Sequence, residues 1–125
     1  MILINSGSNR AQKLGGFSRY VPIGVPIGVG YLAAYLIKHN KTVTILDGEV
    51  NDVTEDVIAD YLKGLIRPYI FGISSLTASI ANAHRVAALL KKTYPESKVI
   101  FGNMHPTVMT EEVLKDRNVD IVVRG

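Results

Sequence analysis

"YIFGISSLTAS", residues 69–79, decides the fold class, because it joins an apolar strand to a loop of small hydroxylated residues. Tyr69 to Ile73 is apolar on both faces, which is typical of a strand in a parallel sheet that helices cover on both sides. The loop after it, "SSLTAS", carries no charged residue. Because ligands of open parallel sheets bind beyond the carboxyl ends of the strands, this stretch predicts an α/β fold with a ligand edge at Ser74.

Four further apolar runs flank this stretch and are rich in β-branched residues, which favour strands. They are Ile2 to Ile4, Thr42 to Leu46, Val99 to Phe101 and Val119 to Val123. Segments of helical period separate them, so strands and helices alternate along the whole chain. This alternation predicts one domain over residues 1–125, built as a doubly wound five-stranded parallel sheet with right-handed crossovers.

The helical segments differ in pattern. Ile27 to His39 is apolar almost all round, which predicts a well-buried helix. A second helix is expected from an N-cap at Thr54 to Pro68, because Glu and Asp follow the cap and an apolar stripe follows them. A third is expected from Ile80 to Pro95, and Thr110 begins a short fourth. The loop "GNMHPT", residues 102–107, follows the fourth strand.

Composition narrows the function classes. The chain has 125 residues, a net charge of +3 and no run of basic residues interleaved with aromatics, so no nucleic-acid partner is expected. It has no cysteine, which excludes disulfides, thiolate zinc sites and cysteine-held clusters within the chain. The most apolar window, Val21 to Ile37, is broken by Pro22 and Pro26, so no membrane span is expected. "MILIN" is no signal peptide, and a cytoplasmic location is expected.

The connection from Asn5 to Pro26 is unusually long. It has about twenty residues where two to six are common, and such loops are usually functional. We expect it to be mobile, because it holds Gly7, Gly15 and Gly16 and has no strong apolar anchor before Phe17.

Several familiar sites do not fit. The turn "NSGSNRAQKLGG" lacks the spacing of a dinucleotide fingerprint, so Asp47 is interpreted as a solvated or capping residue. "GISSLT" lacks the second glycine of a nucleophile elbow. The three histidines, residues 39, 84 and 105, fall on different elements, so no metal site is expected. His39 is interpreted as a surface residue that compensates a helix dipole.

Five motifs in order carry a family resemblance. They are "PIGVGYLAAYL", "VTILDGEV", "FGISSLTAS", "FGNMHPT" with the following "EE", and "DIVVRG". Over nearly its whole length the chain resembles the N-terminal cobalamin-binding domain of cobalamin-dependent radical S-adenosylmethionine enzymes. The resemblance implies a Rossmann-like or flavodoxin-like sheet in the order 2-1-3-4-5. It also implies that these residues are the N-terminal part of a longer protein.

The resemblance implies that cobalamin lies over the carboxyl edge of the sheet, with its nucleotide tail between the loops after the first and third strands. No catalytic residue and no metal ligand is expected. S-adenosylmethionine and a 4Fe-4S cluster are expected only in a radical domain downstream of Gly125, the expected partner in the same polypeptide. The cofactor contacts expected from the resemblance are Ser6, Gly7, Ser74, Ser75, Leu76, Thr77, Gly102, Asn103, His105, Pro106 and Thr107.

The chain departs from the family pattern in two places. Asn103 and Met104 stand where the family has glycine and proline, and the Asp-x-His-x-x-Gly motif that supplies a lower axial histidine is missing from the first loop. His105 is interpreted as a loop residue at the cofactor site, held in extended backbone by Pro106. Two alternatives remain open. One is a cofactor-free structural or interaction domain that docks on a catalytic domain. The other is a flavodoxin-like enzyme using a nucleotide or flavin, although Tyr20 is the only aromatic residue expected at the ligand edge.

Overall fold

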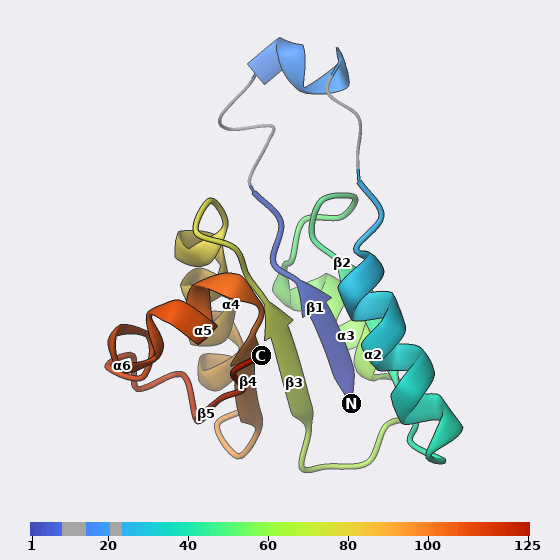
Figure 1. Ribbon diagram of the computed structural model, residues 1–125. Helices are drawn as coiled ribbons and strands as arrows, with labels where there is room; N and C mark the ends of the chain where they lie inside the picture. Colours follow the sequence, from blue (N-terminus) through green and yellow to red (C-terminus); the bar gives the residue numbers. More distant parts are fainter. Residues whose placement is uncertain (9–14, 21–23) are drawn as a thin grey trace.

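A computed structural model describes residues 1–8, 15–20 and 24–125. Its centre is one five-stranded sheet in the order β2-β1-β3-β4-β5, and every strand pairing is parallel (Figure 1). The strands are β1 (Ile2–Asn5), β2 (Thr44–Asp47), β3 (Ile70–Ser74), β4 (Lys98–Gly102) and β5 (Ile121–Val122). The five-stranded parallel sheet and its order are as predicted, although β5 is shorter than the apolar run 119–123.

Helices lie on both sides of the sheet, as in a doubly wound fold. The helix α2 packs on one side, and α3 and α4 pack on the other (Figure 1). The helical elements are η1 (Gly15–Tyr20), α2 (Ile27–Lys38), α3 (Glu55–Leu62), α4 (Ile80–Thr93), α5 (Met104–Val108) and α6 (Thr110–Val113). In the described parts of the chain, no helix combines the length and apolar composition needed to cross a bilayer.

The main core lies between the sheet and the helices α3 and α4. Strand register places Ile4, Ile73 and Phe101 side by side on that face, and all three are fully buried. Removing each such side chain from water contributes about 1.5–3 kcal/mol. This packing fixes the strands relative to one another. It therefore also fixes the positions of their C-terminal ends, which form the carboxyl edge of the sheet.

The opposite face is covered less completely than the sequence suggests. Helix α2 buries Val29 and Ala33 against β1 and β2, but Tyr31 is 77% exposed and Tyr35 is 60% exposed. The prediction that Ile27 to His39 is well buried was therefore wrong. The sequence of a helix that is apolar all round does not show how much of its surface will contact the sheet. Here only one narrow side of α2 packs against the strands.

The predicted end of the helix after Thr54 was also wrong. Thr54 Oγ1 accepts a hydrogen bond from the Val57 N–H at 3.4 Å, which confirms the cap. The helix stops at Leu62 rather than near Pro68, because Gly64 adopts a positive φ of 80°. Such a residue reverses the chain at a helix C-terminus. Ile66, which lies between this early end and Pro68, is 90% exposed.

The segment after β4 is a short helix, α5, and not the loop expected from "GNMHPT". His105 is therefore helical, so its predicted extended backbone was wrong. Pro106 lies in the first turn of α5, where the missing N–H is needed by no carbonyl. Asn103 caps this turn, and its cap outweighs the bias that proline places on the residue before it.

The long connection after β1 is described in part. Gly15 to Tyr20 form the 3₁₀ helix η1, in which Phe17 and Tyr20 are exposed. Residues 9–14 and 21–23 of this connection lie outside the described residues, and the mobility predicted for residues 6–26 stays a prediction.

Candidate functional site

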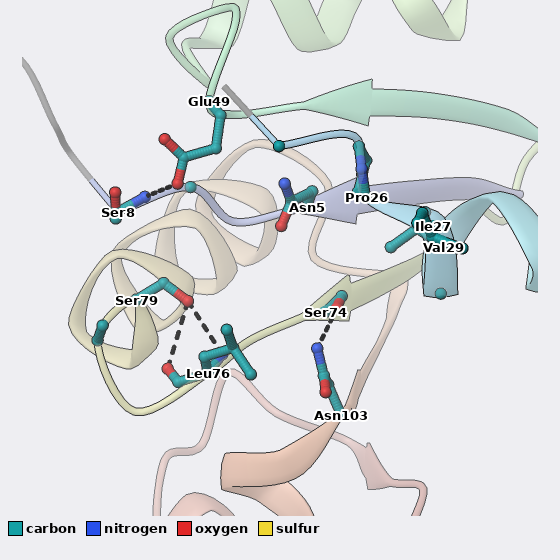
Figure 2. A pocket seen from close by; sticks show the side chains of 14 residues that line it. Asn5, Ser8, Pro26, Ile27, Val29, Glu49, Ser74, Leu76, Ser79 and Asn103 are labelled. Atoms are coloured by element: carbon teal, nitrogen blue, oxygen red, sulfur yellow. Dashed lines mark hydrogen bonds between the residues drawn. The ribbon is translucent and has the colours of Figure 1, made fainter. Parts of the chain in front are cut away.

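A cleft of about 530 Å³ lies at the carboxyl edge of the sheet (Figure 2). It sits where the chain leaves β1 for α2 on one side and leaves β3 for α4 on the other, which is the switch point of the fold. The lining residues come from the loops after β1, β2 and β3, from the start of α2 and from the start of α5. They are Asn5, Gly7, Ser8, Gly24, Pro26, Ile27, Gly28, Val29, Glu49, Ser74, Leu76, Ala78, Ser79 and Asn103.

Polar side chains at the strand ends form the floor of this cleft. Register places Asn5 of β1 between Asp47 of β2 and Ser74 of β3. Asn5 Nδ2 donates to Asp47 Oδ1 at 2.8 Å, and the Glu49 N–H donates to the same oxygen at 3.1 Å. Asp47 therefore has the capping role predicted for it, and its carboxylate is held beside the cleft instead of lining it.

The loop after β1 is tied to the loop after β3 by buried hydroxyls. Ser6 is fully buried, and its Oγ lies 3.0 Å from the Ser74 carbonyl oxygen and 3.0 Å from Ser79 Oγ. Ser79 Oγ in turn accepts from the Leu76 N–H at 3.0 Å. Ser6 thus links the loops after β1 and β3 beside the cleft. Its hydroxyl makes hydrogen bonds within the protein.

Gly7 brings the first loop against the turn after β2. Its φ is 66°, and a Cβ on this residue would lie 2.6 Å from the Gly48 carbonyl carbon. Beside it, Glu49 Oε1 accepts from the Ser8 N–H at 2.7 Å. The buried Asn82 of α4 donates to the Ser6 carbonyl oxygen and holds the same loop from the other side.

Asn103 closes the cleft on the β4 side. Its backbone has φ 85° and ψ −172°, a region essentially restricted to glycine. Its Oδ1 accepts from the Met104 N–H at 2.7 Å, and its Nδ2 donates to Ser74 Oγ at 3.0 Å (Figure 2). The Asn103 amide is therefore turned toward β3, where it links the ends of two strands.

The remaining predicted contacts lie around the cleft. Thr77 is exposed, and its Oγ1 lies 3.1 Å from His105 Nδ1. Thr107 Oγ1 donates to the Asn103 carbonyl oxygen at 2.8 Å, which strengthens the first turn of α5. Ser75 is buried, and among the described residues its hydroxyl has no hydrogen-bond partner.

The structure thus brings part of the predicted set together. Gly7, Ser74, Leu76 and Asn103 line the cleft. The other predicted residues do not line it: Ser6, Ser75, Thr77, Gly102, His105, Pro106 and Thr107. Tyr20, expected at the ligand edge, is exposed and also does not line the cleft.

Sequence reasoning missed the start of α2 and the turn after β2. Pro26 to Val29 and Glu49 all line the cleft. A signal was available for Glu49, because the order 2-1-3 places the loop after β2 beside the loop after β1. For α2, the motif "PIGVG" was recognised, but only as the beginning of a helix.

The residues that the structure describes around the cleft carry little charge. Among its described lining residues Glu49 alone is ionisable, and it already accepts a backbone hydrogen bond. Residues 1–8, 15–20 and 24–125 contain no group of three or more histidine or acidic side chains able to hold a metal. His84 and His105 lie on α4 and α5, and His39 is the exposed C-cap residue that follows α2, a surface position as predicted.

Comparison with known proteins identifies the family of the chain. The B12 binding domain model matches residues 17–125. The chain is 34% identical over 102 residues to the anaerobic magnesium-protoporphyrin IX monomethyl ester cyclase of Rubrivivax gelatinosus, with 80% of this chain and 18% of that protein covered. It is 33% identical over 103 residues to an uncharacterized methyltransferase of Pyrococcus horikoshii, with 82% and 22% covered.

A third relative is the cytidylyl-2-hydroxyethylphosphonate methyltransferase of Streptomyces wedmorensis, 30% identical over 118 residues, with 80% of this chain and 22% of that protein covered. The chain therefore spans about a fifth of the length of these curated relatives. No solved structure is significantly similar to it. With a family model that matches nearly the whole chain, and with the predicted sheet order in place, the chain belongs to the B12 binding domain family, whose cofactor is cobalamin.

Proposed function

We propose that the domain binds cobalamin in the cleft between the loops after β1 and β3, with the nucleotide tail inside the cleft and the corrin over the carboxyl edge. The observation that carries this proposal is a cleft at the switch point of the sheet whose described lining residues include a single ionisable side chain, Glu49. Open α/β sheets bind their ligands at that place. Its volume, about 530 Å³, falls within the range of about 300–1,000 Å³ that is common for ligand pockets.

The lining residues fit the chemistry of this cofactor. Cobalamin combines apolar faces with a rim of neutral amides, so it needs apolar contacts and neutral hydrogen-bonding groups. The cleft supplies the first from Ile27, Val29 and Leu76 and the second from Asn5, Ser74 and Asn103. Among the described residues the Ser74 hydroxyl donates to no protein acceptor, so its hydrogen is available to a ligand.

In this proposal the chain binds and orients the cofactor. Cobalamin, when bound, supplies a cobalt centre suited to alkyl transfer or radical chemistry. The protein side chains at the cleft position the tail, exclude water and hold the two loops at a fixed separation through Ser6 and Ser79. Glu49 is not placed as an acid or base, because its carboxylate accepts the Ser8 N–H.

We further propose that the domain serves a radical S-adenosylmethionine catalytic domain in the same polypeptide, which would hold S-adenosylmethionine and a 4Fe-4S cluster. Two of the relatives are named as methyltransferases and one as a cyclase, and the chain matches about a fifth of each. Methyl transfer or a related radical reaction is the activity that fits both this resemblance and these relatives.

Hydroxocobalamin binding tests the first proposal. The protein is mixed with hydroxocobalamin, free ligand is removed by gel filtration, and the visible spectrum is recorded; retention of about one corrin per chain is expected. Gly28→Trp fills the cleft and should abolish retention. Gly30→Trp is the matched control, because Gly30 lies in the same helix, its added Cβ also meets nothing within 4 Å, and it does not line the cleft. Complete loss of corrin from the unchanged protein would favour the cofactor-free docking domain.

A further inference from the structure

Asn103 keeps a side chain where the backbone favours glycine. Its φ of 85° and ψ of −172° fall in a region that other residues rarely occupy. Glycine is also what the family resemblance expects at this position. A strained residue that lines a ligand cleft is a candidate for a functional role, and the strain is offset here by two side-chain hydrogen bonds.

These two hydrogen bonds fix the orientation of the amide. Only the amide oxygen can accept from the Met104 N–H, so Oδ1 occupies that position, at 2.7 Å. Nδ2 must then face Ser74 Oγ, to which it donates at 3.0 Å (Figure 2). Asn103 is therefore a donor to Ser74 and cannot accept its proton.

This arrangement decides what the Ser74 hydroxyl can do. A serine hydroxyl has one hydrogen and two lone pairs. One lone pair of Ser74 Oγ accepts the hydrogen bond from Asn103 Nδ2, so the hydroxyl hydrogen points in another direction. Within the described residues this hydrogen is donated to no protein group. Ser74 lines the cleft at the end of β3, so this hydrogen is available to a ligand there.

We propose that Asn103 is a positioning residue, which holds the Ser74 hydroxyl as a hydrogen-bond donor toward an acceptor atom of the bound ligand. The chain would consequently select ligands that carry an acceptor at this place in the cleft. This inference rests on the proposed function, because it takes cobalamin as the ligand.

Asn103→Asp separates this role from that of a helix cap. Aspartate caps a helix about as well as asparagine, so its carboxylate can still accept the Met104 N–H. The aspartate side chain has no N–H, however, so it can only accept from Ser74. The Ser74 hydroxyl would then donate its hydrogen to the carboxylate and not to the ligand. A residue that only capped α5 would tolerate this substitution without effect on the ligand.

The test is a double-mutant cycle on the affinity for hydroxocobalamin, measured by visible absorbance titration. Asn103→Asp and Ser74→Ala should each weaken binding roughly 3- to 10-fold, the effect of one lost hydrogen bond. In the Ser74→Ala background, Asn103→Asp should have no further effect, because the donor that it disturbs is already absent. Urea unfolding of each variant checks that the fold is retained.

The outcomes distinguish this inference from the proposed function. If Asn103→Asp leaves the affinity unchanged, or if its loss persists without the Ser74 hydroxyl, Asn103 does not act through Ser74 and the inference is overturned. In the second case the added charge itself would be the cause. If the unchanged protein fails to bind hydroxocobalamin, the proposed function is overturned, and this inference falls with it.

Discussion

Replacing Gly7 by alanine tests whether the contact between the loops after β1 and β2 shapes the cleft. Gly7 has φ 66°, and an added Cβ would lie 2.6 Å from the Gly48 carbonyl carbon and 3.1 Å from the Glu49 nitrogen. A left-handed backbone costs a residue with a Cβ about 1–2 kcal/mol. Steric overlap in a packed region costs about 1–3 kcal/mol more. Gly7→Ala should therefore lower the free energy of unfolding by about 2–5 kcal/mol.

Two other glycines separate these contributions. Gly64 has φ 80° but nothing within 4 Å of its added Cβ, so Gly64→Ala should cost only the backbone term, about 1–2 kcal/mol. At Gly48 an added Cβ would lie 2.6 Å from the Asn5 carbonyl oxygen without a positive φ, so Gly48→Ala isolates the overlap. Both Gly7→Ala and Gly48→Ala should also weaken hydroxocobalamin binding, since relief of the overlap moves Glu49 and Ser8 at the rim of the cleft.

Urea unfolding followed by far-ultraviolet circular dichroism provides the measurement, with the three alanine variants compared at one temperature and pH. If Gly7→Ala is no more destabilising than Gly64→Ala, the two loops are not in close contact. The description of this side of the cleft would then be wrong.

Three further predictions concern Asp120, Thr54 and Ser75. Burial raises the pKa of Asp120, but hydrogen bonds from Lys91 and from the Val99 N–H outweigh it and hold the pKa below 3.8. Because the pKa is lower in the folded state, Asp120 stabilises the protein at neutral pH and this stabilisation is lost as the pH falls through 3.8 and below. Asp120→Asn should flatten the pH dependence of the unfolding free energy between about pH 5 and about pH 2, and an unchanged slope would refute the pairing. Thr54→Ala should lower the unfolding free energy by about 0.5–2 kcal/mol while Thr54→Ser does not, and equal stability of both variants would argue against the cap. Ser75→Ala should leave hydroxocobalamin affinity unchanged and either leave stability unchanged or raise it by up to about 1 kcal/mol, because the buried hydroxyl has no partner among the described residues; a weaker affinity would return Ser75 to the binding site.

The strands were predictable because a few consecutive residues are enough to show the pattern of a buried strand. The run "YIFGI" is apolar on both faces, and "TVTIL" is rich in β-branched residues, so both favour strands of a covered parallel sheet. The order of the strands came from the family resemblance and is confirmed. Thr54 was predictable for the same local reason, since a cap is a relation between residues three positions apart.

The extent of burial was not predictable in the same way. The composition of α2 identifies a helix, but its coverage depends on how much of β1 and β2 it reaches, which leaves Tyr31 and Tyr35 exposed. The helix α5 was missed because Pro106 was weighed as a breaker without its position in the first turn. The cap that outweighs it, Asn103, had been judged only as a departure from the family.

The site was predicted in its position and only partly in its residues. Ser74 and Ser75 are neighbours in sequence, and side chains on a strand alternate between faces. Ser74 accordingly lines the cleft while Ser75 is buried, a distinction that alternation alone could have made. Glu49 and the start of α2 reach the cleft through tertiary packing of segments distant in sequence, which residue patterns in the loops after β1 and β3 do not contain.

A crystal structure of the protein with bound hydroxocobalamin tests the central claim most directly. The account predicts the nucleotide tail between the loops after β1 and β3, with Ser74 Oγ within hydrogen-bond distance of the ligand and Leu76 against its apolar surface. A second cavity, of about 590 Å³, lies at the amino end of the sheet among Leu62, Leu65 and Tyr69. Cobalamin seated there, or over the exposed face of α2, would contradict the assignment of the carboxyl-edge cleft.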